Sequence, residues 1–121
     1  MTTVEHGRRA EQIVADYLKG TGASIVGTNV RSGHYEIDVI ATKNDLVMIV
    51  EVRTRGPGSY EGAFASIDWK KRKRIVSAAQ SLWRSRLSKL PGVNRLRFDC
   101  ASVSFEEAPP KVEYVTGAFT A

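Results

Sequence analysis

Apolar residues recur along the chain at two different spacings, and the change between them predicts the order of helices and strands. Residues 7–19 and 68–90 carry apolar side chains three or four positions apart, which is typical of helices. Gly20 and Gly22 close the first of these segments, and Pro91 with Gly92 ends the second. We therefore expect one helix near the start of the chain and another in its second half.

Short runs rich in β-branched residues predict the strands. We expect strands at residues 23–30, 35–42, 46–54, 96–105 and 111–116. The polar turn Lys43-Asn44-Asp45 joins the second strand to the third, and the glycine-rich residues 55–66 connect the third to the second helix. The order α-β-β-β-α-β-β predicts an α/β fold with a mixed central sheet flanked by helices.

Four charged residues stand at the outer ends of the central strand pair, where burial usually excludes charge. If Asn44 and Asp45 are the central turn residues, Asp38 faces Glu51 and Glu36 faces Arg53, all on one side of the sheet. Facing Cβ atoms lie roughly 4.5 to 5.5 Å apart, so two carboxylates there repel unless positive charge lies between them. A divalent cation is one solution, and Mg²⁺ or Mn²⁺ suits such an oxygen-rich site.

An ordinary ion pair explains part of this pattern equally well. Glu36 and Arg53 would form an exposed cross-strand pair, which is common in sheets. That interpretation leaves Asp38 and Glu51 unexplained, because both adjoin strongly apolar strand residues. A partly buried position that requires a cation explains them better.

Composition limits the kind of protein. The 121 residues predict a single domain, 1–121, and no apolar run approaches the roughly 20 residues that span a membrane. One cysteine and no visible secretory signal favour a reducing cytoplasm. The net charge of +5 favours a polyanionic partner such as nucleic acid.

Basic residues gather where the second helix begins. A basic run at a helix N-terminus opposes the helix dipole, so helix stability does not explain it. A surface that binds phosphates does, although solvated helix faces are often equally basic. The predicted nucleic-acid-binding residues are Arg55, Trp69, Lys70, Arg72, Lys73 and Arg74.

Several short stretches carry a family resemblance, in order, over nearly the whole chain. They are GRRAEQIVADYL, NVRSGHYEIDVIA, VEVRTR, SIDWKK, RFD and the terminal GAF. The chain resembles the PD-(D/E)xK superfamily and, more narrowly, the YraN-like family of small bacterial proteins predicted to be nucleases. The resemblance implies a restriction endonuclease-like core and hydrolysis of phosphodiester bonds with Mg²⁺ or Mn²⁺. DNA, including branched or processed intermediates, is expected as the substrate rather than RNA. A homodimer would suit cleavage of both strands.

The resemblance also implies roles for individual residues. Asp38 and Glu51 would hold the metal, with Glu11 or Glu36 as an additional ligand, and Arg53 and Lys71 would complete the site. The pattern of the first helix independently places Glu11 at the margin of its apolar face. Lys71 precedes Ile75 by one helical turn and should point inward, toward either a substrate phosphate or Glu51.

Two departures from the family pattern leave a second function open. Tyr35 replaces a glycine, which narrows the site or offers a stacking face for a base. Arg53 replaces a lysine and stays protonated, so it cannot act as a general base. The alternative is a non-catalytic nucleic-acid-binding or adaptor domain that retains the nuclease fold.

Overall fold

The computed structural model describes residues 3–55 and 67–120, and these form two α-helices and five strands in the predicted order. Of the predicted connection 55–66, only Arg55 falls within the described backbone. No helix in the described part of the chain is long and apolar enough to cross a membrane. The elements are α1 (Thr3–Gly20), β1 (Ser24–Ser32), β2 (Tyr35–Lys43), β3 (Leu46–Arg55), α2 (Trp69–Ser85), the short 3-10 helix η2 (Leu87–Lys89), β4 (Arg95–Ser104) and β5 (Lys111–Phe119).

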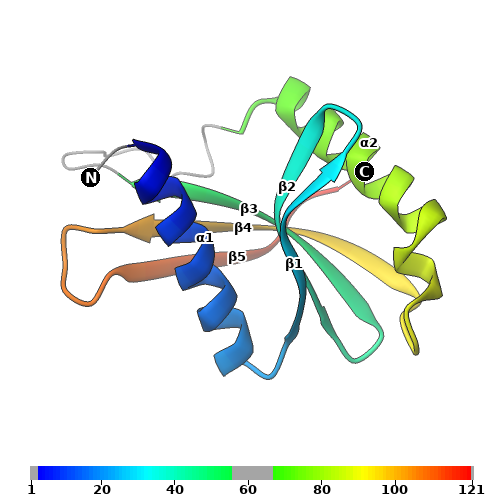
Figure 1. The fold of residues 1–121 in the computed structure, drawn as a ribbon, viewed down its shortest axis with the longest axis horizontal. Coiled ribbons are helices and arrows are strands. Elements are labelled where there is room, and N and C mark those ends of the chain that lie inside the picture. The colour runs from blue at the N-terminus through cyan, green and yellow to red at the C-terminus, as the bar shows by residue number, and fades with distance from the viewer. Residues whose placement is uncertain (1–2, 56–66, 121) are drawn as a thin grey trace.

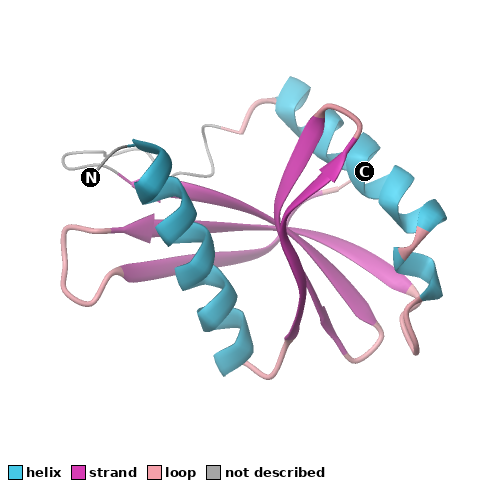
Figure 2. Cartoon of the chain, viewed as in Figure 1, coloured by secondary structure: helices cyan, strands magenta, loops and turns pink. Residues whose placement is uncertain are grey.

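The five strands form one mixed sheet in the order β1-β2-β3-β4-β5. Neighbouring strands are antiparallel except β3 and β4, which are parallel. A parallel pair needs a crossover connection, and α2 lies in the segment that makes it. The strands fan out from the middle of the sheet because of its strong twist (Figure 2). The predicted α/β arrangement is confirmed.

Each helix covers its own side of the sheet and has its own core. Ala10, Val14 and Leu18 of α1 pack with one set of strand residues. The apolar face of α2, from Ile75 to Leu82, packs with another. Along β3 the side chains alternate between the two cores, so this central strand is buried on both faces. The alternation directs Glu51, two residues after Ile49, to the α2 side.

The sheet divides at the end of the β2–β3 pairing. The predicted register is confirmed from Lys43–Leu46 to Val39–Val50, but the pairing stops there. Beyond it, β3 continues in parallel with β4, while β2 continues with β1 as far as Ser32–Tyr35. In Figure 1 the β1–β2 turn accordingly rises beside α2 and away from β3. The expected ladder pairs of Asp38 with Glu51 and of Glu36 with Arg53 are therefore wrong.

Several element boundaries also differ from the prediction, among them the ends of the second helix and of the last strand. The second helix ends at Ser85 because Arg86 leaves the helical conformation, with φ of −151°, and the chain turns so that Leu87 enters the core. The last strand reaches Phe119, beyond the predicted end at residue 116. A register shift in its pairing with β4 and the positive φ of Gly117 let Phe119 stack on Phe98.

Candidate active site

Asp38 is the first residue of β2 beyond the β2–β3 ladder. Its Oδ2 accepts a hydrogen bond of 2.8 Å from the backbone N–H of Val52. A buried backbone N–H needs an acceptor, and here the carboxylate provides one after the β2 backbone has moved away. The same division of the sheet that ends the strand pairing thus fixes the position of this side chain.

Glu51 lies on β3, one residue beyond the last β2–β3 pair. Its side chain is only 5% exposed, and its Oε1 lies 2.8 Å from Nζ of Lys71 in the first turn of α2. Asp68 caps this helix by accepting a hydrogen bond from the backbone N–H of Lys71, which fixes where the lysine leaves the helix. The inward direction predicted for Lys71 is confirmed, and its anion in this structure is Glu51.

The Glu51 carboxyl group perturbs that of Asp38. The pKa of Asp38 is raised from 3.8 to about 8, first because burial disfavours its charged form and then because of the negative charge of Glu51. The hydrogen bond from Val52 opposes this rise, whereas the charge of Glu11 and a hydrogen bond with the Glu51 carboxyl add to it. The site therefore favours a bound proton or a further positive charge.

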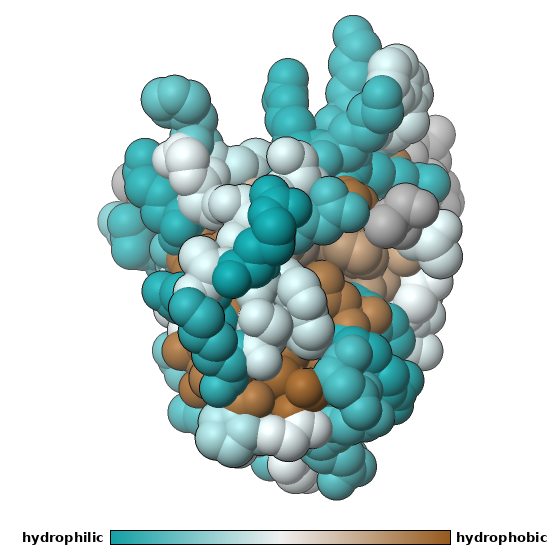
Figure 3. All heavy atoms as spheres, turned by 90° about the vertical axis from the view of Figure 1, so that its right-hand side faces the viewer, coloured by the Kyte–Doolittle hydropathy of each residue, from teal (hydrophilic) through white to brown (hydrophobic). Residues whose placement is uncertain are grey.

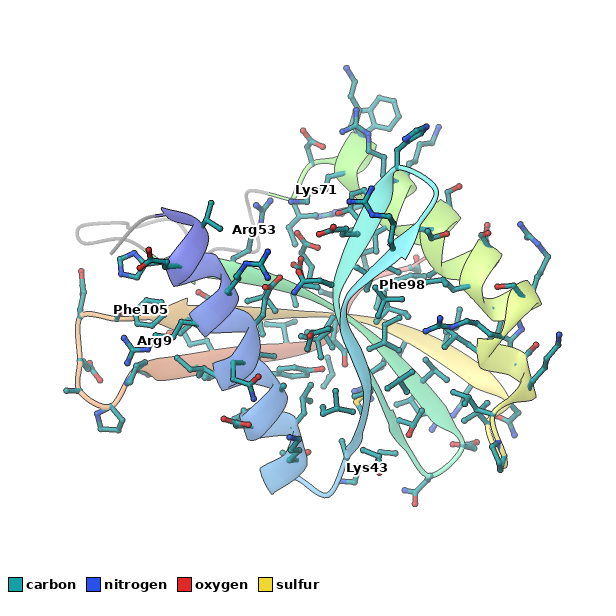
Figure 4. All side chains as sticks on the ribbon, in the orientation of Figure 1. Arg9, Lys43, Arg53, Lys71, Phe98 and Phe105 are labelled. Atoms are coloured by element: carbon teal, nitrogen blue, oxygen red, sulfur yellow. The ribbon has the colours of Figure 1, made fainter. Side chains whose placement is uncertain are left out.

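Arg53 contributes positive charge to the same region. It follows Glu51 by two positions on β3 and pairs with the buried Ser102 of β4. Its charge lowers the pKa of Tyr35 and of Cys100, in each case against the larger effect of burial. Figure 4 shows Arg53 and Lys71 reaching from β3 and α2 into the region where β2 leaves β3.

The other two acidic residues predicted for the site, Glu11 and Glu36, differ in position from Asp38 and Glu51. Glu11 on α1 is half-buried and acts on Asp38 through its charge. Glu36 is exposed and pairs with Arg31 across the β1–β2 ladder at 3.0 Å. Among the described residues, no three His, Cys, Asp or Glu side chains gather as a metal-binding group. The structure brings Asp38 and Glu51 together without Glu36, and a metal-binding role for Glu36 stays a prediction.

Comparison with known proteins identifies the family. A model of the uncharacterised protein family UPF0102 matches residues 10–103. The chain belongs to the UPF0102 family. A UPF0102 protein of Sorangium cellulosum is 46% identical over 114 residues, which are 93% of this chain and 79% of that protein. UPF0102 proteins of Pseudomonas aeruginosa (strain UCBPP-PA14) and Parabacteroides distasonis are 32% and 34% identical, covering 97% and 95% of this chain and 94% and 92% of their own.

The family match confirms the YraN-like resemblance at the level of the family. Its range contains every residue of the site described above, from Glu11 on α1 to Ser102 on β4. The names of these relatives state no activity. Any function of this UPF0102 chain must therefore be argued from the chemistry of its own side chains.

The predicted basic surface of this UPF0102 chain lies along the start of α2. Trp69 is 62% exposed and carries Nζ of Lys73 over its ring at 5.0 Å. Lys70 and Arg74 are also exposed. Arg72 instead donates from Nε to the carbonyl of Ile67 and stacks over Phe119, so part of its role is structural. The side chain of Arg55 lies outside the described residues.

A buried polar network lies on the α1 side of the sheet. Arg97 and Asp99 pair through two hydrogen bonds of 2.7 and 2.8 Å. The hydroxyl of Tyr114 and the N–H of Gly117 also donate to Asp99, which is fully buried. Both carboxylate oxygens of Asp99 thus accept hydrogen bonds from within the protein, whereas Asp38 and Glu51 accept fewer.

Cys100 has a neighbour that sequence reasoning missed. The parallel β3–β4 register places it beside Glu51, just as it places Ser102 beside Arg53. The alternation of these side chains along the strand was visible in the sequence, but the register between strands separated by α2 was not. Cys100 is therefore a packing residue that also forms one wall of the site.

The Cys100 thiol is expected to be unreactive in the folded protein. It is 0% exposed, and burial followed by the charge of Glu51 raises its pKa to about 12. At pH 8, 5,5′-dithiobis(2-nitrobenzoate) should leave the native thiol unmodified and should release one equivalent of thionitrobenzoate after denaturation. Release within minutes from the native protein would contradict the burial of this wall.

Proposed function

We propose that this chain is a metal-dependent nuclease that hydrolyses phosphodiester bonds in DNA, on a restriction endonuclease-like core. The pairing of the half-buried carboxyl group of Asp38 with the buried carboxyl group of Glu51 carries the proposal. The raised pKa of Asp38 means that this pair opposes folding unless a proton or a cation joins it. Strongly perturbed groups of this kind cluster at functional sites.

The donor set fits a hard divalent cation. Mg²⁺ takes oxygen ligands and is often held by one or two carboxylates together with water and substrate phosphates. The contacts to Val52 and Lys71 each use one oxygen of a carboxyl group, Oδ2 of Asp38 and Oε1 of Glu51. When bound, Mg²⁺ or Mn²⁺ supplies polarisation of the scissile phosphate and lowers the pKa of a coordinated water.

The remaining residues act electrostatically. Lys71 holds the Glu51 carboxylate in position and brings an ammonium group to the site. Arg53 stays protonated, so it holds phosphate oxygens and offsets the negative charge that develops during cleavage. Hydrolysis on this scheme needs no nucleophilic side chain, which agrees with the inert environment of Cys100.

A second candidate is a non-catalytic nucleic-acid-binding or adaptor domain. The observation that favours it is the short Lys71–Glu51 ion pair, because a lysine that already neutralises this carboxylate reduces its demand for a metal. The ion pair does not neutralise Asp38, however, whose pKa stays raised in its presence. The nuclease therefore remains the better supported candidate.

A cleavage assay tests the proposal. Labelled single-stranded, duplex, flapped and four-way-junction DNAs, with matching RNAs, are incubated with Mg²⁺, with Mn²⁺ or with EDTA. We expect products with either metal, none with EDTA, and none from the Glu51→Ala variant with any of them. Salt-sensitive binding without products from any substrate would favour the adaptor domain.

A further inference from the structure

A groove of about 700 Å³ lies between the β1–β2 turn and the exposed side of α2. His34 and Tyr35 line it from the turn, and Lys73, Arg74 and Ser77 line it from the helix. The groove exists because β2 stops pairing with β3 beyond Val39–Val50, and the β1–β2 turn rises beside α2. It is therefore a product of the same division of the sheet that forms the carboxylate site.

The walls of this groove suit a nucleotide. Lys73 and Arg74 supply positive charge, Ser77 and Ser81 supply hydroxyl groups, and none of the residues that line the groove is acidic. Tyr35 offers an aromatic ring from the opposite wall. Positive charge that follows a phosphate backbone, combined with an aromatic ring for a base, is how proteins bind single strands without reading their sequence. Figure 3 shows hydrophilic side chains projecting at the upper end of this side of the molecule.

Tyr35 connects the groove to the candidate active site. Its phenol group lies in the electrostatic field of Glu51, Asp38 and Arg53 of the site and also in that of Arg74, which lines the groove. Asp38 follows Tyr35 by three residues on β2, a distance of roughly 10 Å at about 3.3 Å per residue. A strand lying in the groove would thus have a neighbouring phosphate near the two carboxylates.

A second groove, of about 590 Å³, lies on the other side of Lys73 and Ser77. Trp69 lines it and is 62% exposed, an unusual position for a large aromatic side chain. The two grooves share Lys73 and Ser77, so one strand could pass from one to the other across the face of α2. Trp69 would then provide a stacking platform for the next base.

The size of the groove indicates whether the bound nucleic acid is single-stranded or duplex. A volume of about 700 Å³ lies in the range of pockets for small ligands, roughly 300 to 1,000 Å³, and suits one unpaired nucleotide. We infer that this groove binds an unpaired nucleotide of the strand to be cleaved, so that single-stranded or frayed nucleic acid is preferred to intact duplex. That this strand is a substrate rests on the proposed nuclease function. That the groove binds it does not depend on that function.

Binding without metal tests the inference. Fluorescence anisotropy in EDTA compares a labelled 12-nucleotide DNA, the same sequence as RNA, and a 12-base-pair duplex. We expect the wild type to bind the single strand about tenfold or more tightly than the duplex. Comparable or tighter binding of the duplex would overturn the inference, and the RNA arm decides which kind of strand is preferred.

Matched variants locate the binding site. Ser81→Phe fills the groove and Arg74→Glu reverses one of its charges, so each should weaken single-strand binding about tenfold. Ser85→Phe and Arg84→Glu make the same changes on α2 outside the groove and should weaken it less than about threefold. Equal losses from both pairs of variants would show that the general charge of the helix, and not the groove, binds the strand.

The cleavage assay separates this inference from the proposed function. Metal-dependent cleavage of intact duplex that is unaffected by Ser81→Phe would overturn the inference about the groove and would support the proposed nuclease function. Single-strand binding that depends on the groove, without cleavage of any substrate, would overturn the proposed nuclease function and would support the groove as a binding site for single strands.

Discussion

Replacing Asp38 with asparagine is expected to abolish metal-dependent cleavage and, in the absence of metal, to stabilise the fold. Loss of an anionic ligand should lower the cleavage rate by at least about 10³-fold, or roughly 4 kcal/mol of transition-state stabilisation. Asparagine keeps an oxygen that can accept the hydrogen bond from Val52 but carries no charge next to Glu51. At pH 7 the free energy of unfolding should therefore rise by about 2–4 kcal/mol.

The pH dependence of this gain follows from the raised pKa of Asp38. Between 3.8 and about 8 the folded state retains a proton that the unfolded state has lost. The wild type is therefore expected to lose stability as pH rises through this window, and the loss is complete only above the folded-state pKa. The asparagine variant has no such loss, so its advantage should be small near pH 4 and largest above pH 8.

Thermal unfolding in EDTA, followed by circular dichroism from pH 4.5 to 8.5, measures the effect. Asp45→Asn is the matched control, because Asp45 forms an exposed pair with Arg95 and should change stability by less than about 1 kcal/mol. If Asp38→Asn instead destabilised the protein at every pH, Asp38 would have to be regarded as a structural capping residue.

Replacing Lys71 with methionine is expected to have a large effect in the opposite direction. Methionine preserves much of the apolar stem but leaves Glu51, which is 5% exposed, without its cation. Breaking a buried ion pair on one side typically costs about 3–5 kcal/mol. Because Lys71 is 31% exposed and water screens part of the interaction, we expect a loss of about 2–4 kcal/mol in urea denaturation.

A double-mutant cycle distinguishes the ion pair from general packing. Glu51→Gln combined with Lys71→Met should recover most of the lost stability, because no buried charge then remains unpaired. Lys70→Met, at the exposed neighbouring position, should change stability by less than about 0.5 kcal/mol. Failure of the double variant to recover would mean that Lys71 stabilises the protein through contacts other than Glu51.

Local patterns predicted the parts of the fold that depend on local physics. The turn at Asn44 and Asp45 set the β2–β3 register correctly, because the hairpin connection fixes which residues face each other. Helical spacing likewise predicted that Lys71 points inward, because its position relative to Ile75 is a property of the helix alone.

Features that depend on contacts between distant elements were not predictable in this way. The end of the β2–β3 ladder at Val39–Val50 depends on the packing of the hairpin beside α2, and no local pattern marks it. The prediction therefore paired Glu36 with Arg53 instead of Arg31. The parallel β3–β4 register, which places Cys100 beside Glu51, was hidden for the same reason.

The parallel insertion of β4 beside β3 also has a consequence for synthesis of the chain. The central segment Leu46, Val47, Met48, Ile49 and Val50 is fully apolar, yet one edge of it is covered only by residues that follow α2. While the chain emerges from the ribosome, this edge is available for pairing with other chains until residues 95–104 arrive. Nascent or truncated chains that lack β4 should therefore aggregate and require a chaperone.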